Sequence, residues 1–169
     1  MSSLMRWIAA ALLSFGLVLP AKAIAQASWQ GVVSYVVDGD TLYVRPTGGG
    51  KPRSVRLLGI DAPEICQAGG VRAREVLNAH VLTREVTVFT QGKDSYGRHL
   101  STVQLDNYDL GHWMVSQGHA WSYRYRNQLG LYDPVQQQAR LARHGLFADA
   151  KAETPGAFRR RNGSCRLPP

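Results

Sequence analysis

Apolar and polar residues alternate in several short runs of the chain, and this alternation predicts β-strands. Three closely spaced runs predict a meander, over residues 31–37, 41–45 and 54–60. Asp38 and Gly39 between the first two form a typical turn sequence, and the glycine-rich segment 47–52 separates the second from the third. Two later runs, 85–90 and 100–105, predict a fourth and a fifth strand.

Three segments have a period of three to four residues instead, which predicts helices. The first is 71–82, whose shared apolar face consists of Ala73, Val76, Leu77 and Val81. The second is 109–117. The third begins with Asp133 as its N-cap and Pro134 at its first position, and it ends before Gly145. Its buried face is expected to consist of Val135, Ala139, Ala142 and Leu146.

The predicted element order, β-β-β-α-β-β-α-α, suggests an α+β protein that is mainly a β-barrel. Five short strands with a helix inserted after the third are typical of a five-stranded OB-fold barrel, here with three helices. The length of 169 residues fits one such domain, which we place at 28–150. The C-terminal tail, 151–169, is rich in proline and arginine and is expected to be irregular.

The first 25 residues have the parts of a secretory signal peptide. Arg6 precedes an apolar run of about 13 residues, and alternate alanines between 21 and 27 suggest a cleavage site between Ile24 and Ser28. The run is shorter than the ~20 residues that span a bilayer as a helix. We therefore predict an exported protein, periplasmic or secreted, that has no stable membrane association after cleavage. The alternative is an uncleaved membrane anchor.

The composition excludes a disordered chain, because 44% of the residues are apolar and only 19% are charged. The net charge of +8 suits a polyanionic partner, either nucleic acid or an anionic membrane surface. The five histidines lack metal-binding spacings, and two cysteines without clustered histidines cannot make a four-ligand zinc site.

Acidic residues gather in turns at the ends of the predicted strands. The turn that contains Asp38 and Asp40 could bind a hard cation through its carboxylates, or could be ordinary turn chemistry. Asp61 and Glu64 follow the third strand, and Pro63 between them stiffens the turn. Such carboxylates could hold a hard cation and activate a water molecule.

Two arginines accompany these acids. Arg56 shares a strand face with apolar residues and needs an anionic partner, either a substrate phosphate or a nearby acid in a structural ion pair. Arg98 lies on a loop that begins at Asp94, and its alternative role is that of a solvated surface residue. Carboxylates for a cation and a water, with arginines for phosphate oxygens, are what metal-assisted phosphodiester hydrolysis requires.

Three segments, VVDGDTLYV, VRLLGIDAPE and DSYGRHL, closely resemble in this order the motif blocks of the staphylococcal nuclease family. The resemblance covers about residues 31–147. It implies an OB barrel with three helices and a Ca²⁺-dependent nuclease. We separately expect the protein to be a monomer. Water would attack phosphorus and the 5′-oxygen would leave, giving 3′-phosphate ends. The substrates would be DNA and RNA, with little sequence preference.

The resemblance also implies roles for individual residues. The calcium ligands of the family are matched by Asp40, Asp61 and the backbone carbonyl of Ala62. The proposed general base is matched by Glu64, and the phosphate-binding arginines are matched by Arg56 and Arg98. Aromatic residues of the nucleotide site are matched by Tyr96, Tyr123 and Tyr125. The chain departs from the best-known member at Ala62, which replaces a threonine, and at Ser95, which replaces a lysine beside the first tyrosine.

Two alternatives have other functions. One is a non-catalytic nucleic-acid-binding module on the same barrel, and the other is a secreted adhesion or structural protein, which would not need Arg56, Glu64 and Arg98 together.

The cysteines at 66 and 165 are expected to form a disulfide in an exported protein, with two free thiols as the alternative. A Cys66–Cys165 bridge would tether the tail beside Glu64 and could bring the arginines at 159–161 toward the substrate backbone.

Overall fold

The computed structural model describes residues 28–126 and 128–165, so the predicted signal peptide and its cleavage site lie outside the described residues, Ser28 excepted. The strands are β1 (Ser28–Val36), β2 (Thr41–Pro46), β3 (Arg53–Leu57), β4 (Ile60–Asp61), β5 (Glu85–Lys93), β6 (His99–Leu105), β7 (Tyr108–Asp109) and β8 (Trp121–Ser122). The helices are α1 (Gly70–Val81), α2 (Leu110–Ser116), α3 (Asp133–Leu141) and α4 (Pro155–Asn162), with a short 3-10 helix, η1 (Gly145–Ala148).

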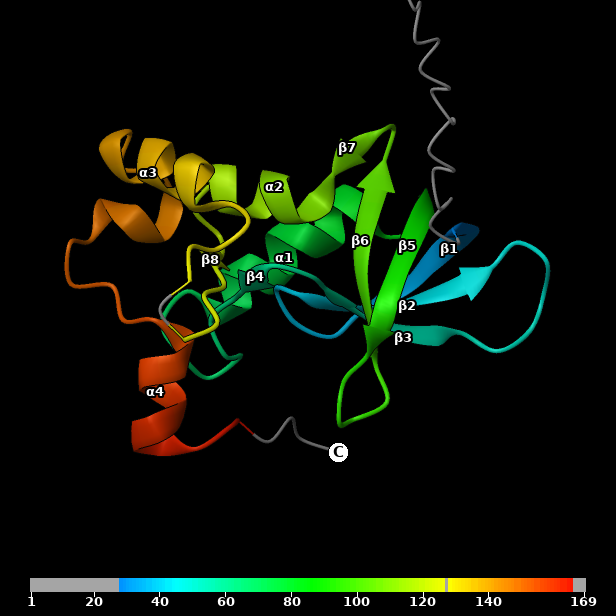
Figure 1. The fold of residues 1–169 in the computed structure, drawn as a ribbon, viewed down its shortest axis with the longest axis horizontal. Coiled ribbons are helices and arrows are strands. Elements are labelled where there is room, and N and C mark those ends of the chain that lie inside the picture. Colours follow the sequence, from blue (N-terminus) through cyan, green and yellow to red (C-terminus); the bar gives the residue numbers. More distant parts are fainter. Residues whose placement is uncertain (1–27, 127, 166–169) are drawn as a thin grey trace, which may run out of the picture.

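Five strands close into a barrel of the predicted OB type (Figure 1). Antiparallel pairs join β1 to β2 and β5, β2 to β3, and β5 to β6, and the parallel pair β3–β6 completes the circle. The alternating sequence fills the interior, because each barrel strand has at least one completely buried valine or leucine, among them Val33, Leu42, Val55, Val88 and Val103. Burying such a side chain contributes about 1.5–3 kcal/mol to stability. The α+β barrel fold is therefore confirmed.

The predicted strand at 54–60 is interrupted at Leu58 and Gly59, and the interruption helps to position Asp61. Gly59 has a φ of 78°, a conformation that glycine adopts without strain. After this turn, β4 leaves the barrel sheet and pairs with β8, so that Asp61 lies opposite Trp121. The strand that carries Asp61 therefore belongs to a small second sheet.

The helix α3 differs from its prediction in length and in its buried face. It ends at Leu141, where the structure exposes Ala142 and places Leu146 in η1. The buried positions are Asp133, Gln136 and Ala139. Polar side chains can be buried here because they are paired: Gln136 Oε1 accepts a hydrogen bond of 2.9 Å from the Ser122 N–H, and Asp133 binds Arg124 at 2.7 Å. The predicted face is therefore right only in part: Ala139 is buried and Val135 packs against the core, but Ala142 is exposed.

The C-terminal tail is not irregular, because residues 155–162 form α4. Thr154 caps this helix by accepting a 3.4 Å hydrogen bond from the Ala157 N–H, and Pro155 occupies the first turn. Gly163, with a φ of 74°, follows its last residue. Residues 28–126 and 128–165 therefore contain four α-helices, one more than predicted.

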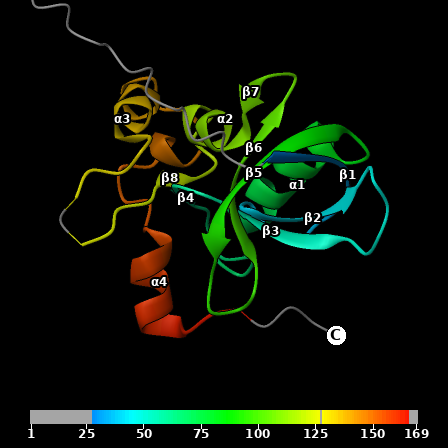
Figure 2. The ribbon, with the colours of Figure 1, turned by 45° about the vertical axis from the view of Figure 1, so that its right-hand side comes forward.

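The helix α4 lies near the end of the barrel from which the β5–β6 loop projects, and two views at different angles agree on this placement (Figures 1 and 2). Helix α3 lies at the upper left in both views, beyond β8 and above α4. Among the described residues, no helix is both long and apolar enough to span a membrane.

Candidate active site

A cleft of about 680 Å³ collects most of the charged residues that the sequence singled out, and Asp61 lies beside it, in contact with Arg56. It is lined by Asp38 and Asp40 from the β1–β2 turn, Arg56 from β3, Glu64 from the segment after β4, Arg98 from the β5–β6 loop and Arg159 from α4. The closing strands of the barrel and the appended helix thus contribute to one site.

Asp40 is held in place by several donors. The Ala62 N–H donates to its Oδ2 at 2.8 Å, and the Thr41 hydroxyl donates to its Oδ1 at 3.0 Å. Arg56 forms an ion pair with the same carboxylate. Burial acts to raise the pKa of Asp40, but the charge of Arg56 and the hydrogen bond from Ala62 outweigh it and hold this pKa below its ordinary value. Asp40 is therefore ionised at neutral pH.

Arg56 connects the two carboxylates that the sequence assigns to a metal. Its Nη2 lies 3.3 Å from Asp61 Oδ1 while its Nη1 pairs with Asp40. The arginine thus has acidic partners, as the ion-pair alternative expected, although Asp40 was not one of the acids considered. One guanidinium that reaches both carboxylates places Asp40 and Asp61 side by side.

Asp61 and Glu64 are positioned by the segment between β4 and α1. Asp61 is 7% exposed, and burial raises its pKa although Arg159 and Arg56 act in the opposite direction. The Glu64 N–H donates to Gln67 Oε1 at 3.2 Å, and the Gln67 N–H donates to the Glu64 carbonyl at 2.8 Å. These two hydrogen bonds fix the backbone of Glu64 and leave its side chain in the cleft.

Gly70 at the start of α1 makes the tight segment possible. A Cβ on this residue would lie 1.9 Å from the Glu64 carbonyl oxygen, so no larger residue fits without moving the backbone of Glu64.

Arg98 is oriented by Asp94, four residues before it on the β5–β6 loop. The Asp94 carboxylate accepts 2.7 Å and 3.0 Å hydrogen bonds from the Nε and the backbone N–H of Arg98. Arg98 Nη1 also donates to the Thr41 hydroxyl at 3.3 Å. The sequence pattern places Asp94 at the start of this loop and indicates no role for it. The structure makes it the residue that aims Arg98 at the cleft.

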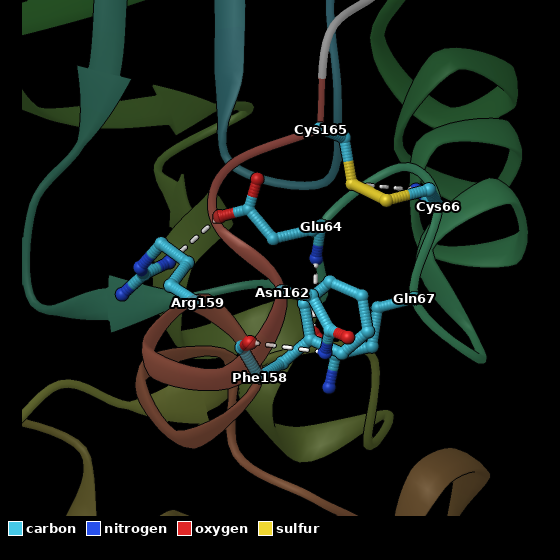
Figure 3. The surroundings of a disulfide bond; sticks show 7 residues. All are labelled: Glu64, Cys66, Gln67, Phe158, Arg159, Asn162 and Cys165. Atoms are coloured by element: carbon cyan, nitrogen blue, oxygen red, sulfur yellow. Dashed lines mark hydrogen bonds and ion pairs between the residues drawn. A yellow bond between two sulfur atoms is a disulfide. The ribbon is translucent and has the colours of Figure 1, made fainter.

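Arg159 makes the contact that the sequence did not predict. Its Nη1 donates to Asp61 Oδ1 at 3.1 Å and to Glu64 Oε1 at 2.8 Å, and its Nη2 donates to Asp61 Oδ2 at 2.9 Å. These bonds, first of all those to Asp61, raise the pKa of Arg159 above its ordinary value. The arginine was expected near the substrate backbone, but it contacts two of the predicted catalytic and metal-binding carboxylates. Figure 3 shows its contact with Glu64.

The Cys66–Cys165 disulfide joins the end of the α4 segment to the chain just after Glu64 (Figure 3). The two Cα atoms are 5.8 Å apart, within the range that a disulfide requires. The Cys66 N–H also lies 3.1 Å from Cys165 Sγ. The bridge and the Arg159 contacts therefore hold α4 against the site from two sides.

The three tyrosines differ in their positions. Tyr96 is 83% exposed on the β5–β6 loop and lines the cleft, with the Arg98 guanidinium carbon 5.3 Å from its ring centroid. Tyr123 also lines the cleft. Tyr125 is exposed and does not line this cleft. The structure thus brings two of the three tyrosines to the site.

The oxygen donors of the site suit a hard cation. Asp40 and Asp61 lie together, and Ala62 adjoins Asp61 and contacts Asp40 through its N–H. In the part of the chain that the structure describes, no three His, Cys, Asp or Glu side chains converge as a ready-made metal cage. These residues could together hold a hard cation in an open site.

Comparison with known proteins agrees with this geometry. A family model described as staphylococcal nuclease homologue matches residues 54–149. Protein ParB of Escherichia coli is 36% identical over 173 aligned residues, which cover 92% of this chain and 95% of that protein. Micrococcal nuclease of Shigella flexneri is 37% identical, with 80% and 83% of the two chains covered. An uncharacterized endonuclease of Haemophilus influenzae is also 37% identical, with 74% and 70% covered.

Proposed function

We propose that this protein, which belongs to the staphylococcal nuclease family, is a calcium-dependent nuclease that hydrolyses phosphodiester bonds in DNA and RNA with little sequence specificity. The observation that carries the proposal is the convergence of Arg56, Glu64 and Arg98 on one cleft beside two buried carboxylates. The names of two similar proteins, a micrococcal nuclease and an endonuclease, support the same activity.

Asp40, Asp61 and the carbonyl of Ala62 would hold the calcium ion. A bound ion supplies positive charge next to phosphate oxygens and makes a bound water more acidic. So few protein ligands predict calcium binding at roughly millimolar concentration. Magnesium should substitute poorly, because it requires stricter octahedral geometry than this site provides.

The residues of the chain itself would perform the remaining steps. Arg98 and Arg56 would donate hydrogen bonds to the phosphate and stabilise the charge that develops on its oxygens. Glu64 would accept a proton from the attacking water. As the new bond from oxygen to phosphorus forms, the bond to the 5′-oxygen breaks, and the leaving oxygen takes a proton from solvent. The products are a 3′-phosphate end and a 5′-hydroxyl end.

Cleavage of single-stranded DNA and of RNA, with calcium and with a calcium chelator, tests the activity. We expect cleavage only with calcium and with little base preference, and an end-group analysis should find 3′-phosphates. Equal turnover in magnesium and calcium would contradict the metal assignment.

The alternative is a non-catalytic nucleic-acid-binding module. The contacts of Arg159 with Asp61 and Glu64 favour this alternative if the guanidinium stays there when metal and substrate are present. Binding of DNA with calcium but without cleavage would support it.

We also propose that the protein is exported and acts as a monomer. The Cys66–Cys165 disulfide supports an oxidising compartment, because such bonds are rare in the cytosol. N-terminal sequencing of the exported protein and its sedimentation test these two proposals.

A further inference from the structure

A second cleft, of about 690 Å³, adjoins the active site and takes its walls from α3 and α4. The two clefts share two lining residues, Tyr123 and Arg159. We propose that this second cleft binds the phosphodiester backbone of a single-stranded nucleic acid next to the bond that is cut. The identity of the ligand rests on the proposed function, while the site itself rests on the charge and shape described below.

The second cleft is strongly cationic. Its lining includes four arginines, Arg124, Arg140, Arg159 and Arg160, and one acid, Asp61, which belongs to the active site. Two of these arginines are neutralised: Arg124 binds Asp133 at 2.7 Å, and Arg159 binds the active-site acids.

The other two arginines, Arg140 and Arg160, have no carboxylate within 4 Å among residues 28–126 and 128–165. Arg140 comes from α3 and Arg160 from α4, so the free charges lie on two different walls. The guanidinium of Arg140 lies 4.8 Å from the centroid of the Phe147 ring, which limits its freedom while its charge stays unpaired. Two unpaired guanidiniums in a concave site are suited to phosphate groups, which they bind with paired hydrogen bonds.

The shared wall explains why a nucleic acid would enter both clefts. A polynucleotide bound for cleavage must extend beyond the scissile phosphate. Tyr123, which is 46% exposed, lies at the boundary and presents an aromatic ring on which a base can stack. A cleft of this volume suits a few small groups, so it favours a single strand over a duplex.

The subsite depends on α4, which contributes Arg160 and is fastened to the active-site segment by the Cys66–Cys165 bridge. The match to the family model ends at residue 149, before this helix. The chain therefore builds its second cleft with a segment that lies outside the matched domain.

The variant Arg140→Gln/Arg160→Gln tests the proposal, and neither residue touches the carboxylates of the active site. Binding of a labelled homothymidine oligonucleotide would be measured by fluorescence anisotropy at several salt concentrations, with metal chelated so that nothing is cleaved. A dinucleotide, which fills only the active-site cleft, is the second ligand. The matched control, Arg45→Gln/Lys51→Gln, removes the same charge from the exposed β2–β3 hairpin, which lies on the far side of the barrel from α4 (Figure 1).

The salt dependence gives the expected size of the effect. Each phosphate contact with a single strand contributes about −0.7 to the slope of log affinity against log salt, so the loss of two contacts should lower the slope by about 1.4. When salt rises from about 50 to 200 mM, the affinity for the oligonucleotide falls in both proteins. The fall should be ~sevenfold larger for the wild type than for the variant. Dinucleotide binding should not change, and Arg140→Lys/Arg160→Lys should keep most of the slope, because lysine retains the charge.

Equal slopes for the glutamine variant and its control would overturn the proposal, as would an equal loss of dinucleotide binding. The proposed function fails separately, if the wild type with calcium cleaves neither DNA nor RNA. In that case the anisotropy measurement still decides whether the second cleft binds a strand.

Discussion

The variant Arg159→Gln should bind calcium more tightly than the wild type, because Arg159 occupies oxygens that the metal needs. Both oxygens of Asp61 and one oxygen of Glu64 accept hydrogen bonds from this guanidinium, at 2.8–3.1 Å. A cation that coordinates Asp61 must first displace it. Glutamine removes the positive charge and the fork of donors while it keeps much of the side chain.

The magnitude follows from the exposure of the pair. Hydrogen bonds to charged groups contribute about 1.5–3 kcal/mol when shielded, and exposed ion pairs contribute at most about 1 kcal/mol. The side chain of Arg159 is 33% exposed and that of Asp61 is 10% exposed, so the pair is neither fully shielded nor fully exposed. Its contribution to the free energy should therefore be intermediate, about 1–2 kcal/mol. The dissociation constant for calcium should then fall by about 5- to 30-fold.

Isothermal titration of calcium into metal-free protein, without substrate, measures this change directly. Arg161→Gln is the matched control, because Arg161 lies on the same helix but pairs with Glu153 at 2.5 Å and lines neither cleft. Identical dissociation constants for the two variants would refute the reasoning. Weaker calcium binding by Arg159→Gln would mean that the arginine helps to build the metal site instead of competing for it.

Three further changes test other parts of the structure. Glu64→Gln should lower kcat by about 10²–10⁴-fold and leave DNA binding nearly unchanged, and full activity would exclude Glu64 as the base. Replacing Cys66 and Cys165 by serine removes a bridge between positions 99 residues apart, worth up to about 4–5 kcal/mol in chain-entropy models, and should lower the Tm in a thermal melt. Burial and the charge of Asp40 raise the pKa of Asp38 from 3.8 to about 7. Between pH 3.8 and about pH 7 the folded state therefore binds more protons than the unfolded state, so the protein loses stability as pH rises through this range. Asp38→Asn should therefore raise the Tm in metal-free buffer more at pH 8 than at pH 5, and an equal gain at both would contradict that pKa.

The barrel could be predicted because its strands obey a local rule. Val33, Leu42, Val55 and their counterparts alternate with exposed residues, and the alternation alone specifies which face is buried. The proximity of Asp40, Arg56 and Asp61 could be predicted because they lie in short motifs in or next to those strands. The ion pair between Arg56 and Asp40 then follows from the pairing of β3 with β2, which places Arg56 opposite Thr41, next to Asp40.

Other features depended on information that no local pattern carries. The contact between Arg159 and Asp61 joins residues 98 positions apart and exists only because α4 packs beside the barrel end. Helix α4 itself had start and stop residues in Thr154, Pro155 and Gly163, but the proline- and arginine-rich composition suggested an irregular tail. The buried face of α3 was predicted only in part, because hydrogen-bonded Gln136 is buried beside Ala139 while Ala142 is exposed.

The two arginines on the active-site carboxylates differ in a way that decides which one a metal displaces. Arg56 is 16% exposed, lies on a barrel strand and pairs with both Asp40 and Asp61, so its displacement would leave a largely buried guanidinium without these partners. Arg159 is 33% exposed on a terminal helix that also borders the cationic second cleft. We expect calcium to replace Arg159 and to leave Arg56 in place. The displaced guanidinium would then lie between the two clefts, where the backbone of a bound strand must pass.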